Sequence, residues 1–114
     1  MEKTSSAAFQ VAKEQAWQEA GEGVKRQIMG YDGQLMVVKV DFLTGAVGTP
    51  HTHPHSQATY VASGKFKVKI GDEEAVLQEG DGYYVAPGVI HGCVCLEEGR
   101  LVDTFSPMRQ DFLP

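Results

Sequence analysis

The sequence predicts an all-β protein that forms a small antiparallel sandwich or barrel in a single domain. Three observations lead to this fold class. Charged and apolar side chains alternate with period two from Lys65 to Ile70, as in a strand with one buried face. Gly, Pro and Asp turn residues recur at short intervals, and no long amphipathic helix follows Gly21. A chain of 114 residues has room for one compact core.

Eight strands are expected between the turns. In the second of them, Met36, Val38 and Phe42 share the inner face, and Leu35 and Val37 make the outer face partly apolar. The expected strands span Val24–Met29, Gln34–Phe42, Gln57–Ala62, Lys65–Ile70, Glu74–Leu77, Tyr83–Val85, His91–Cys95 and Arg100–Phe105.

The chain divides into three parts on composition. Residues 1–20 are rich in Ala, Glu and Gln and are predicted to form an N-terminal arm. Residues 21–106 form the barrel, and residues 107–114 are a tail too short to fold alone, so it should pack on the barrel. The arm adds a strand to its own sheet or to a partner's. A swapped arm that covers Leu35 and Val37 would make a homodimer, and the sequence leaves both arrangements open.

The charge balance limits the classes of partner. Ten basic and fifteen acidic residues give a net charge of −5, which argues against nucleic acid. An anionic small molecule must then be attracted by local positive charge. No apolar run of about 18 residues is present, which argues against a membrane span, and Met1–Ala8 lacks the pattern of a secretory signal. A cytoplasmic location is expected, with Cys93 and Cys95 as buried thiols.

Three of the four histidines lie in the segment His51-Thr52-His53-Pro54-His55. In an extended strand, residues two apart share a face, so His51 and His53 can point at one position, with Gln57 at the same parity. His91 is the obvious third histidine ligand. Imidazole nitrogen suits zinc, copper, iron and nickel. The alternative is a hydrogen-bonded polar cluster, and His55 is expected to contact substrate or to lie on the rim.

These positions also form two spaced motifs. Gly45, His51, His53 and Gly64 fall on the first motif of the cupin superfamily, and Gln57 stands where that motif has glutamate. Gly80, Gly88 and His91 resemble the second motif. The resemblance implies a small jelly-roll barrel that holds one divalent transition metal ion, namely zinc, nickel, iron or manganese. The implied ligands are His51, His53, Gln57 and His91.

The glutamine changes the charge of the predicted site. Three neutral imidazoles and an amide leave the charge of a divalent ion uncompensated, which makes the ion a stronger Lewis acid. Such a site should attract an anionic substrate and stabilise negative charge that develops on its oxygens. The missing carboxylate makes dioxygenase chemistry less favoured without excluding it.

A second group of candidates lies near the C-terminus. Asp103 and Phe105 share parity, and with Arg109 they can move a proton, pack on a ring and clamp a carboxylate. The alternative is a surface ion pair between Asp103 and Arg109. Thr59 shares parity with Gln57 and is expected to line the same pocket.

Most of the chain resembles the small pectin-degradation cupins. The resemblance rests on Gly23–Arg26, His51–Gln57, Tyr60–Val61, Ser63–Phe66, His91–Cys93, Asp103–Pro107 and Asp111–Leu113. It implies an isomerase that converts 4,5-unsaturated monouronates from pectin or alginate to linear keto-uronates. The implied catalytic residues are Asp103, Phe105 and Arg109, and we expect Arg109, Thr59 and His55 at the substrate. A metal-dependent dioxygenase and a non-catalytic sugar-binding module are the rival functions.

Overall fold

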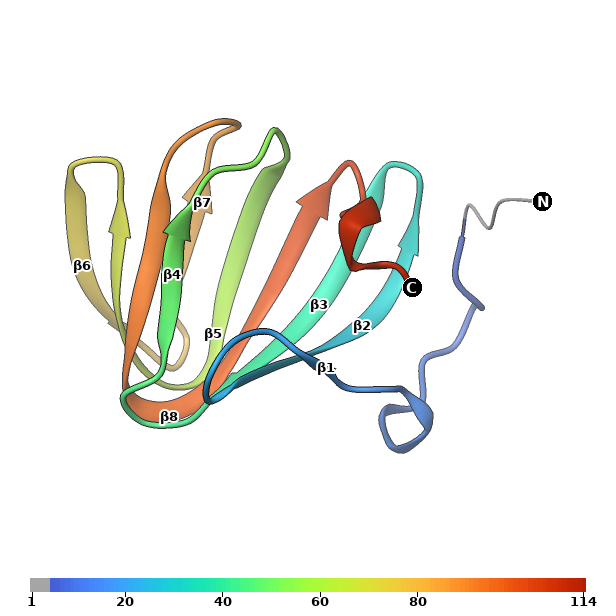
Figure 1. Cartoon of the computed structure of the whole chain (residues 1–114), viewed down its shortest axis with the longest axis horizontal. Helices are drawn as coiled ribbons and strands as arrows, with labels where there is room; N and C mark the ends of the chain where they lie inside the picture. Colours follow the sequence, from blue (N-terminus) through green and yellow to red (C-terminus); the bar gives the residue numbers. More distant parts are fainter. Residues whose placement is uncertain (1–4) are drawn as a thin grey trace.

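The computed structural model describes residues 5–114 and consists almost entirely of β-strands (Figure 1). The strands are β1 Gln18–Glu19, β2 Val24–Asp32, β3 Leu35–Phe42, β4 Val47–His51, β5 Ser56–Ile70, β6 Glu73–Gln78, β7 Gly82–Val85 and β8 His91–Ser106. Two short 3-10 turns, η1 Ala12–Glu14 and η2 Gln110–Phe112, lie near the two ends. Every strand pairing in the described part is antiparallel, and the predicted jelly-roll architecture is confirmed.

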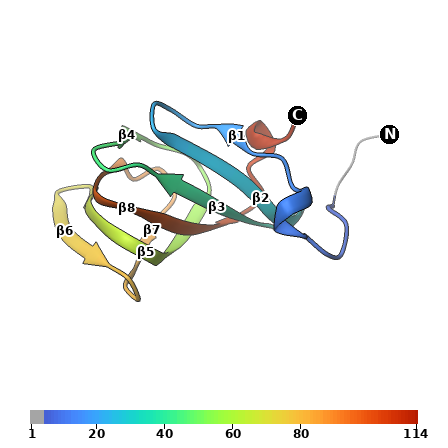
Figure 2. The ribbon, with the colours of Figure 1, turned by 90° about the horizontal axis from the view of Figure 1, so that it is seen from below.

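The two long strands β5 and β8 connect the two halves of the barrel. One end of β8 pairs with β4, from His91 to Val94, and its other end pairs with β3, from Gly99 to Phe105. In the same way β5 pairs first with β7 and then with β6. Because both strands pass from one half to the other, the sheet curves back on itself, as the view from below shows (Figure 2).

The sequence prediction divided each of these long strands in two, and this was wrong. Gly64 and Gly99 look like turn residues, yet they lie where the paired strands β5 and β8 pass from one half of the barrel to the other and where their register shifts. Gly64 has φ +84°, and a Cβ at this position would lie 2.6 Å from the Glu97 carbonyl oxygen. Glycine is therefore needed here for close backbone approach within a continuous strand.

The prediction also missed two strands. β4 contains Gly48 and Pro50, which disfavour a strand assignment and hide any alternation. β1 is only two residues long, and Gln18 and Glu19 pair with Arg26 and Lys25 of β2. β1 lies within the segment predicted as an arm.

The core has two parts. The larger part includes an edge-to-face pair between Phe42 and Phe66, with ring centroids 5.2 Å apart. The smaller part consists of Met36, Val38 and Phe105, and it lies at the end of the barrel that carries the histidines. Three side chains of residues 107–114 pack against this smaller cluster, namely Met108, Phe112 and Leu113.

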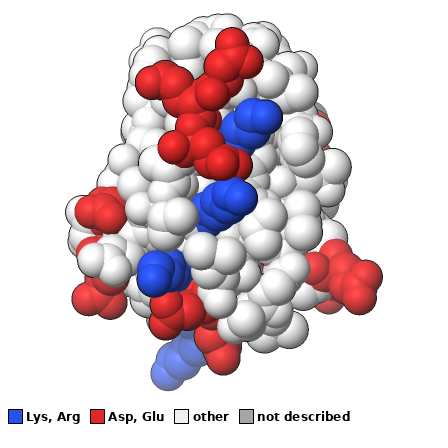
Figure 3. Space-filling model, turned by 90° about the vertical axis from the view of Figure 1, so that its left-hand side faces the viewer, with Lys and Arg blue, Asp and Glu red and all other residues white. Residues whose placement is uncertain are grey.

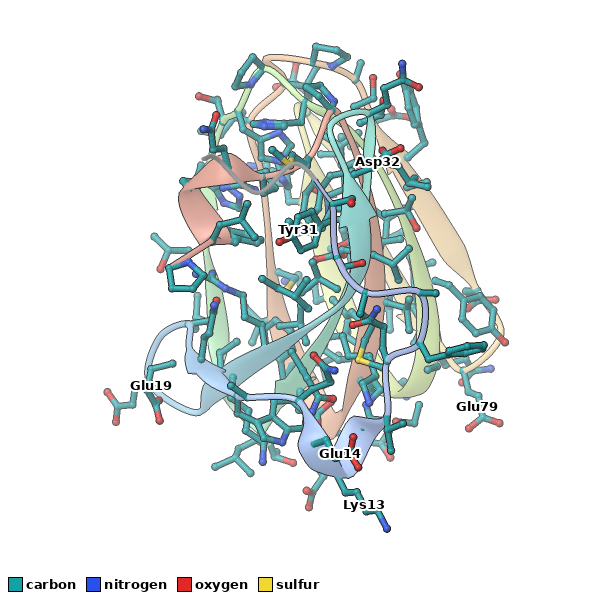
Figure 4. The ribbon with its side chains drawn as sticks, turned by 90° about the vertical axis from the view of Figure 1, so that its right-hand side faces the viewer. Lys13, Glu14, Glu19, Tyr31, Asp32 and Glu79 are labelled. Carbon is teal, nitrogen blue, oxygen red and sulfur yellow. The ribbon has the colours of Figure 1, made fainter. Side chains whose placement is uncertain are left out.

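The N-terminal segment packs against β2 of its own chain (Figure 4). The backbone of Ser6 pairs with Tyr31, and the buried Gln27 amide donates to the carbonyls of Ala12 and Gln15 at 2.8 and 3.1 Å. Leu35 on the outer face is 48% exposed. Residues 1–4 of the predicted arm lie outside the described residues, and a swapped homodimer stays a prediction.

Charged side chains of both signs are mixed on the face drawn in Figure 3. Lys65 lies 3.8 Å from Glu97 and Lys67 lies 3.7 Å from Glu74, each pair across neighbouring strands. Cys93 and Cys95 are free thiols, and Cys95 is buried in the core. Within residues 5–114 no helix has the length and hydropathy needed to cross a membrane.

Candidate metal centre

Three histidines converge at one end of the barrel. His51 ends β4 and His91 begins β8, and the two residues are direct partners in the antiparallel pairing. His53 comes from the loop between β4 and β5. One ring nitrogen of each histidine lies within 4.8 Å of the others, which is close enough for a single metal ion to bind all three. Ring centroids are 4.4 Å apart for His51 and His91, and 4.8 Å apart for His53 and His91.

The route by which His51 and His53 come together differs from the prediction. We expected both in one extended strand, whereas the chain leaves β4 after His51 and His53 lies in a loop. The prolines at 50 and 54 flank this pair and restrict the local backbone. The loop, rather than strand parity, turns the His53 ring toward its partners.

Backbone carbonyls fix the protonation of all three rings. The Nδ1 atoms of His51, His53 and His91 lie 2.9, 3.1 and 2.9 Å from the carbonyl oxygens of Thr49, His55 and Val89. Since a carbonyl oxygen only accepts, each Nδ1 must donate, and the neutral ring then carries its lone pair on Nε2. In metal sites, a hydrogen bond of this kind from the ring nitrogen that does not bind the metal orients the histidine ligand.

Gln57 supplies a fourth donor atom to the same position. Its Oε1 lies 2.9 Å from Nε2 of His53, and its amide nitrogen donates to Thr59 Oγ1 at 2.9 Å. The Thr59 hydroxyl in turn donates to Asp103, an arrangement that fixes which end of the amide faces His53. Two lone pairs therefore meet between Gln57 and His53, a contact that a shared cation would relieve.

Two further observations fit a divalent ion. His91 Nε2 is buried and has no hydrogen-bond partner among the described residues. Burial lowers the pKa of His53 and of His91, so both rings favour the neutral form that binds metal. Three imidazoles with one amide oxygen suit zinc, nickel or iron. The predicted ligands His51, His53, Gln57 and His91 thus lie together, and their role as ligands remains a proposal.

A carboxyl group lies behind Gln57. Thr59 Oγ1 donates to Asp103 Oδ1 at 2.6 Å, and the Gln57 amide nitrogen lies 3.4 Å from the same oxygen. Thr59 and Asp103 are direct neighbours in the pairing of β5 with β8. Enclosure within the barrel raises the pKa of Asp103 to about 6, against the lowering effect of the Thr59 hydrogen bond. Near neutral pH this carboxyl group can therefore both accept and release a proton.

A cavity of about 420 Å³ extends from this group toward the C-terminal segment. It is lined by His51, Gln57, His91, Asp103, Phe105 and Arg109, among others. The structure thus brings the predicted catalytic residues together with the predicted metal ligands. Its size suits a monosaccharide, because small-molecule pockets start at roughly 300 Å³.

Arg109 pairs with Asp111. The sequence had predicted either a free carboxylate clamp or an ion pair with Asp103. Its Nε and Nη2 atoms donate to the two carboxylate oxygens of Asp111 at 3.0 and 2.8 Å. Its guanidinium carbon lies 5.0 Å from the ring centroid of Phe105 and 4.2 Å from that of Phe112. The possible ion pair with Asp103 is not among the salt bridges of residues 5–114. Asp111 already occupies the edge that would clamp a carboxylate.

His55 lies beside the centre without lining the cavity. Its Nε2 donates to the Met108 carbonyl at 3.2 Å, which ties the loop after β4 to the C-terminal tail. The substrate contact expected for His55 stays a prediction.

Arg26 and Tyr83 are among the cavity-lining residues that the sequence prediction missed. Arg26 shares parity on β2 with the inward-facing Val24 and Ile28, and that pattern was the available signal. Burial raises the pKa of the Tyr83 phenol, which stays protonated.

A second depression of about 850 Å³ lies at the far end of β3, around Gly23, Phe42 and Glu98. It has no histidine, and its Arg100 is engaged by Asp41 through two hydrogen bonds. Among the described residues, the one group of side chains that could hold a metal ion lies at the smaller cavity.

The comparison with protein families decides what kind of barrel this is. The family described as "Cupin domain" matches residues 38–105, which is more than half of the chain. This chain belongs to the cupin family.

Close relatives of this cupin are known. It is 50% identical over 102 residues to the pectin degradation protein KdgF of Dickeya dadantii (strain 3937), and this match covers 88% of the chain and 93% of that protein. An RmlC-like cupin from Shewanella frigidimarina NCIMB 400 superposes with a TM-score of 0.94 at 42% identity, over 97% of this chain and 100% of that one. KdgF from Halomonas sp. gives 0.89 at 39% identity, over 95% and 100%. The resemblance to the pectin-degradation cupins is thus confirmed.

Proposed function

We propose that this cupin is a metal-dependent isomerase that converts 4,5-unsaturated monouronates from pectin or alginate to linear keto-uronates. The observation that carries the proposal is the connected series in which Gln57 Oε1 contacts His53 Nε2 while the Gln57 amide nitrogen donates to Thr59, which in turn donates to Asp103. It joins the candidate metal ligands to a carboxyl group that can exchange a proton near neutral pH. The 50% identity to a pectin degradation protein supports this class of substrate.

The proposed reaction needs proton transfers and no oxidant. The hydroxyl group at C1 of the sugar loses a proton, the bond between C1 and the ring oxygen breaks, and C4 gains a proton as the enol at C5 becomes a ketone. One proton leaves and one is added, so the product is an isomer of the substrate. A group that both accepts and releases a proton is therefore sufficient.

The residues that line the cavity, and Thr59 behind them, have separate parts in this scheme. Asp103 exchanges the proton, and Thr59 holds the Asp103 carboxyl group in place. Phe105 packs against the sugar ring and excludes water, and Arg109 presents to the substrate the donors that Asp111 leaves free. A divalent ion held by His51, His53, Gln57 and His91 would supply Lewis-acid polarisation of substrate oxygens.

The test is a direct assay on unsaturated monouronates. The substrate has a conjugated enol-ether absorbance in the ultraviolet that disappears on conversion to the keto acid. We expect metal-loaded protein to remove this band, and we expect a chelator to abolish the activity. Oxygen uptake is measured in parallel. Stoichiometric oxygen consumption would favour a dioxygenase, and unchanged absorbance with several uronates would overturn the isomerase proposal.

A further inference from the structure

The positive charge that Arg109 brings to the cavity is already neutralised. Asp111 takes two of its donors in parallel hydrogen bonds of 3.0 and 2.8 Å, which is the geometry with which arginine binds a carboxylate. The Arg109 side chain is only 11% exposed in this arrangement. A substrate carboxylate must displace Asp111 or use the remaining donors.

A second guanidinium group lines the same cavity. Arg26 lies on the same face of β2 as Val24 and Ile28 and lines the cavity. Its Nε donates to Oε1 of Gln18 at 2.8 Å. Gln18 is a neutral partner and leaves the charge of Arg26 in place. Arg26 also takes part in none of the salt bridges found within residues 5–114.

The two guanidinium groups are neighbours. The Arg26 guanidinium carbon lies 3.7 Å from the centroid of the Phe112 ring, and that of Arg109 lies 4.2 Å from the same centroid. Because both distances are measured to the same centroid, the two guanidinium carbons lie no farther apart than the sum of the two distances. Burial first and the charge of Arg109 second lower the pKa of Arg26, and the charge of Asp111 offsets part of this lowering. A carboxylate bound beside Arg26 would act in the same direction as Asp111.

The position of Arg26 is well defined. Gln18 accepts from Arg26 Nε and donates from its own amide nitrogen to the Phe112 carbonyl at 2.9 Å. The Phe112 ring supports the guanidinium plane from one side. With Nε and the ring contact accounted for, the two terminal nitrogens of Arg26 remain available at the cavity, and a carboxylate can bind both of them.

We propose that Arg26 binds the carboxylate of the sugar acid and determines the preference of this cupin for uronates over neutral sugars. This inference rests on the proposed function for the identity of the anion. Arg109 then acts through the donors that Asp111 leaves free.

The test compares Arg26→Gln, Arg26→Lys and Arg109→Gln with Lys25→Gln. Lys25 is the matched control, since it is the next residue on the same strand and lies exposed on the opposite face. Two measurements are made on metal-loaded protein: KM for an unsaturated monouronate, and calorimetric affinity for saturated galacturonate and for galactose. Metal content and Tm of each variant show that the fold is kept.

We expect Arg26→Gln to raise KM and to weaken galacturonate binding by about 10-fold to 100-fold, which is the usual effect of losing charge-assisted hydrogen bonds. Galactose binding should not change. Arg26→Lys should recover part of the loss, and Lys25→Gln should behave as wild type. Unchanged KM and galacturonate affinity in Arg26→Gln would overturn the proposal. So would an equal loss for galactose, or a selective loss in Arg109→Gln alone.

The two proposals fail in different ways. If the wild type turns over no unsaturated uronate but binds galacturonate through Arg26, the reaction is wrong and the carboxylate site stands. If turnover is normal and Arg26→Gln has no effect, the reaction stands and the role of Arg26 is wrong. If the wild type neither turns over nor binds a uronate, both are overturned.

Discussion

Gln57 shows how one side chain joins two kinds of chemistry. Its amide oxygen faces His53 and its amide nitrogen donates to Thr59, which holds Asp103. A glutamate would offer no donor to Thr59 and would place a second carboxylate beside Asp103. The amide therefore suits a site in which an adjacent carboxyl group exchanges protons.

The variant Asp103→Asn tests whether the Asp103 carboxyl group exchanges the proton. The amide keeps the shape of the side chain but cannot exchange the proton, so activity on the unsaturated uronate should fall by about 100-fold to 10,000-fold. Bound metal should stay at the wild-type level, because Asp103 is not among the proposed ligands. Full activity in this variant, measured with its metal content, would eliminate the role assigned to Asp103.

Asp103 also predicts a dependence of stability on pH in metal-free protein. Its pKa in the folded state is raised to about 6 from 3.8, so the folded state binds this proton more tightly than the unfolded state does. The contribution to stability is present below about pH 4 and is lost as the pH rises through 6. The Tm of Asp103→Asn relative to wild type should therefore be higher at pH 7.5 than at pH 4, two values chosen on either side of that range. If the Tm of Asp103→Asn relative to wild type instead falls as the pH rises, the raised pKa of Asp103 is contradicted.

At the level of elements, the long antiparallel pairing of β5 with β8 positions the site. Both strands continue from one half of the barrel into the other, so Thr59 and Asp103 face each other at one end, while Phe66 lies opposite Cys95 in the core. Gly64 permits the close approach, since a Cβ there would lie 2.6 Å from the Glu97 carbonyl oxygen.

Gly64→Ala should therefore destabilise the barrel more than Gly45→Ala. Both glycines have similar positive φ values, +84° and +86°, but the space around a Cβ at position 45 is open. Strain from φ costs about 1–2 kcal/mol at each position, and Gly64→Ala adds a backbone clash. Unfolding in urea gives the free energy of unfolding of each of the two variants. Equal losses would show that the close approach at Gly64 is unimportant.

For the whole molecule, segments from both chain ends complete the cavity. Gln18 of β1 binds Arg26 and the Phe112 carbonyl, so the N-terminal segment and the tail meet at the mouth of the barrel. The tail also packs Phe112 and Met108 against the core cluster around Phe105. The cavity therefore depends on residues from nearly the full length of the chain.

The sequence predicted the fold class and the clustering of candidate ligands well, because period-two alternation and histidine spacing are local signals. It failed where contacts between distant segments decide the outcome. Gly64 resembles a turn residue until the neighbouring strand β8 is known. The parity of Arg26 indicates an inward position, but its contacts with Gln18 and Phe112 depend on segments distant in the chain. The pairing of Arg109 with Asp111 depends on the path of the tail.

The proposed site of His51, His53, Gln57 and His91 should bind one divalent ion, which can be checked by metal stoichiometry. Wild-type protein, loaded and then freed of loose metal, should hold one ion per chain. Substituting any one of the three clustered histidines with alanine should reduce this to a small fraction. His55→Ala is the matched control, because its ring donates to the Met108 carbonyl, and it should keep the full amount. Equimolar metal in His91→Ala, or equal loss in His55→Ala, would contradict the account.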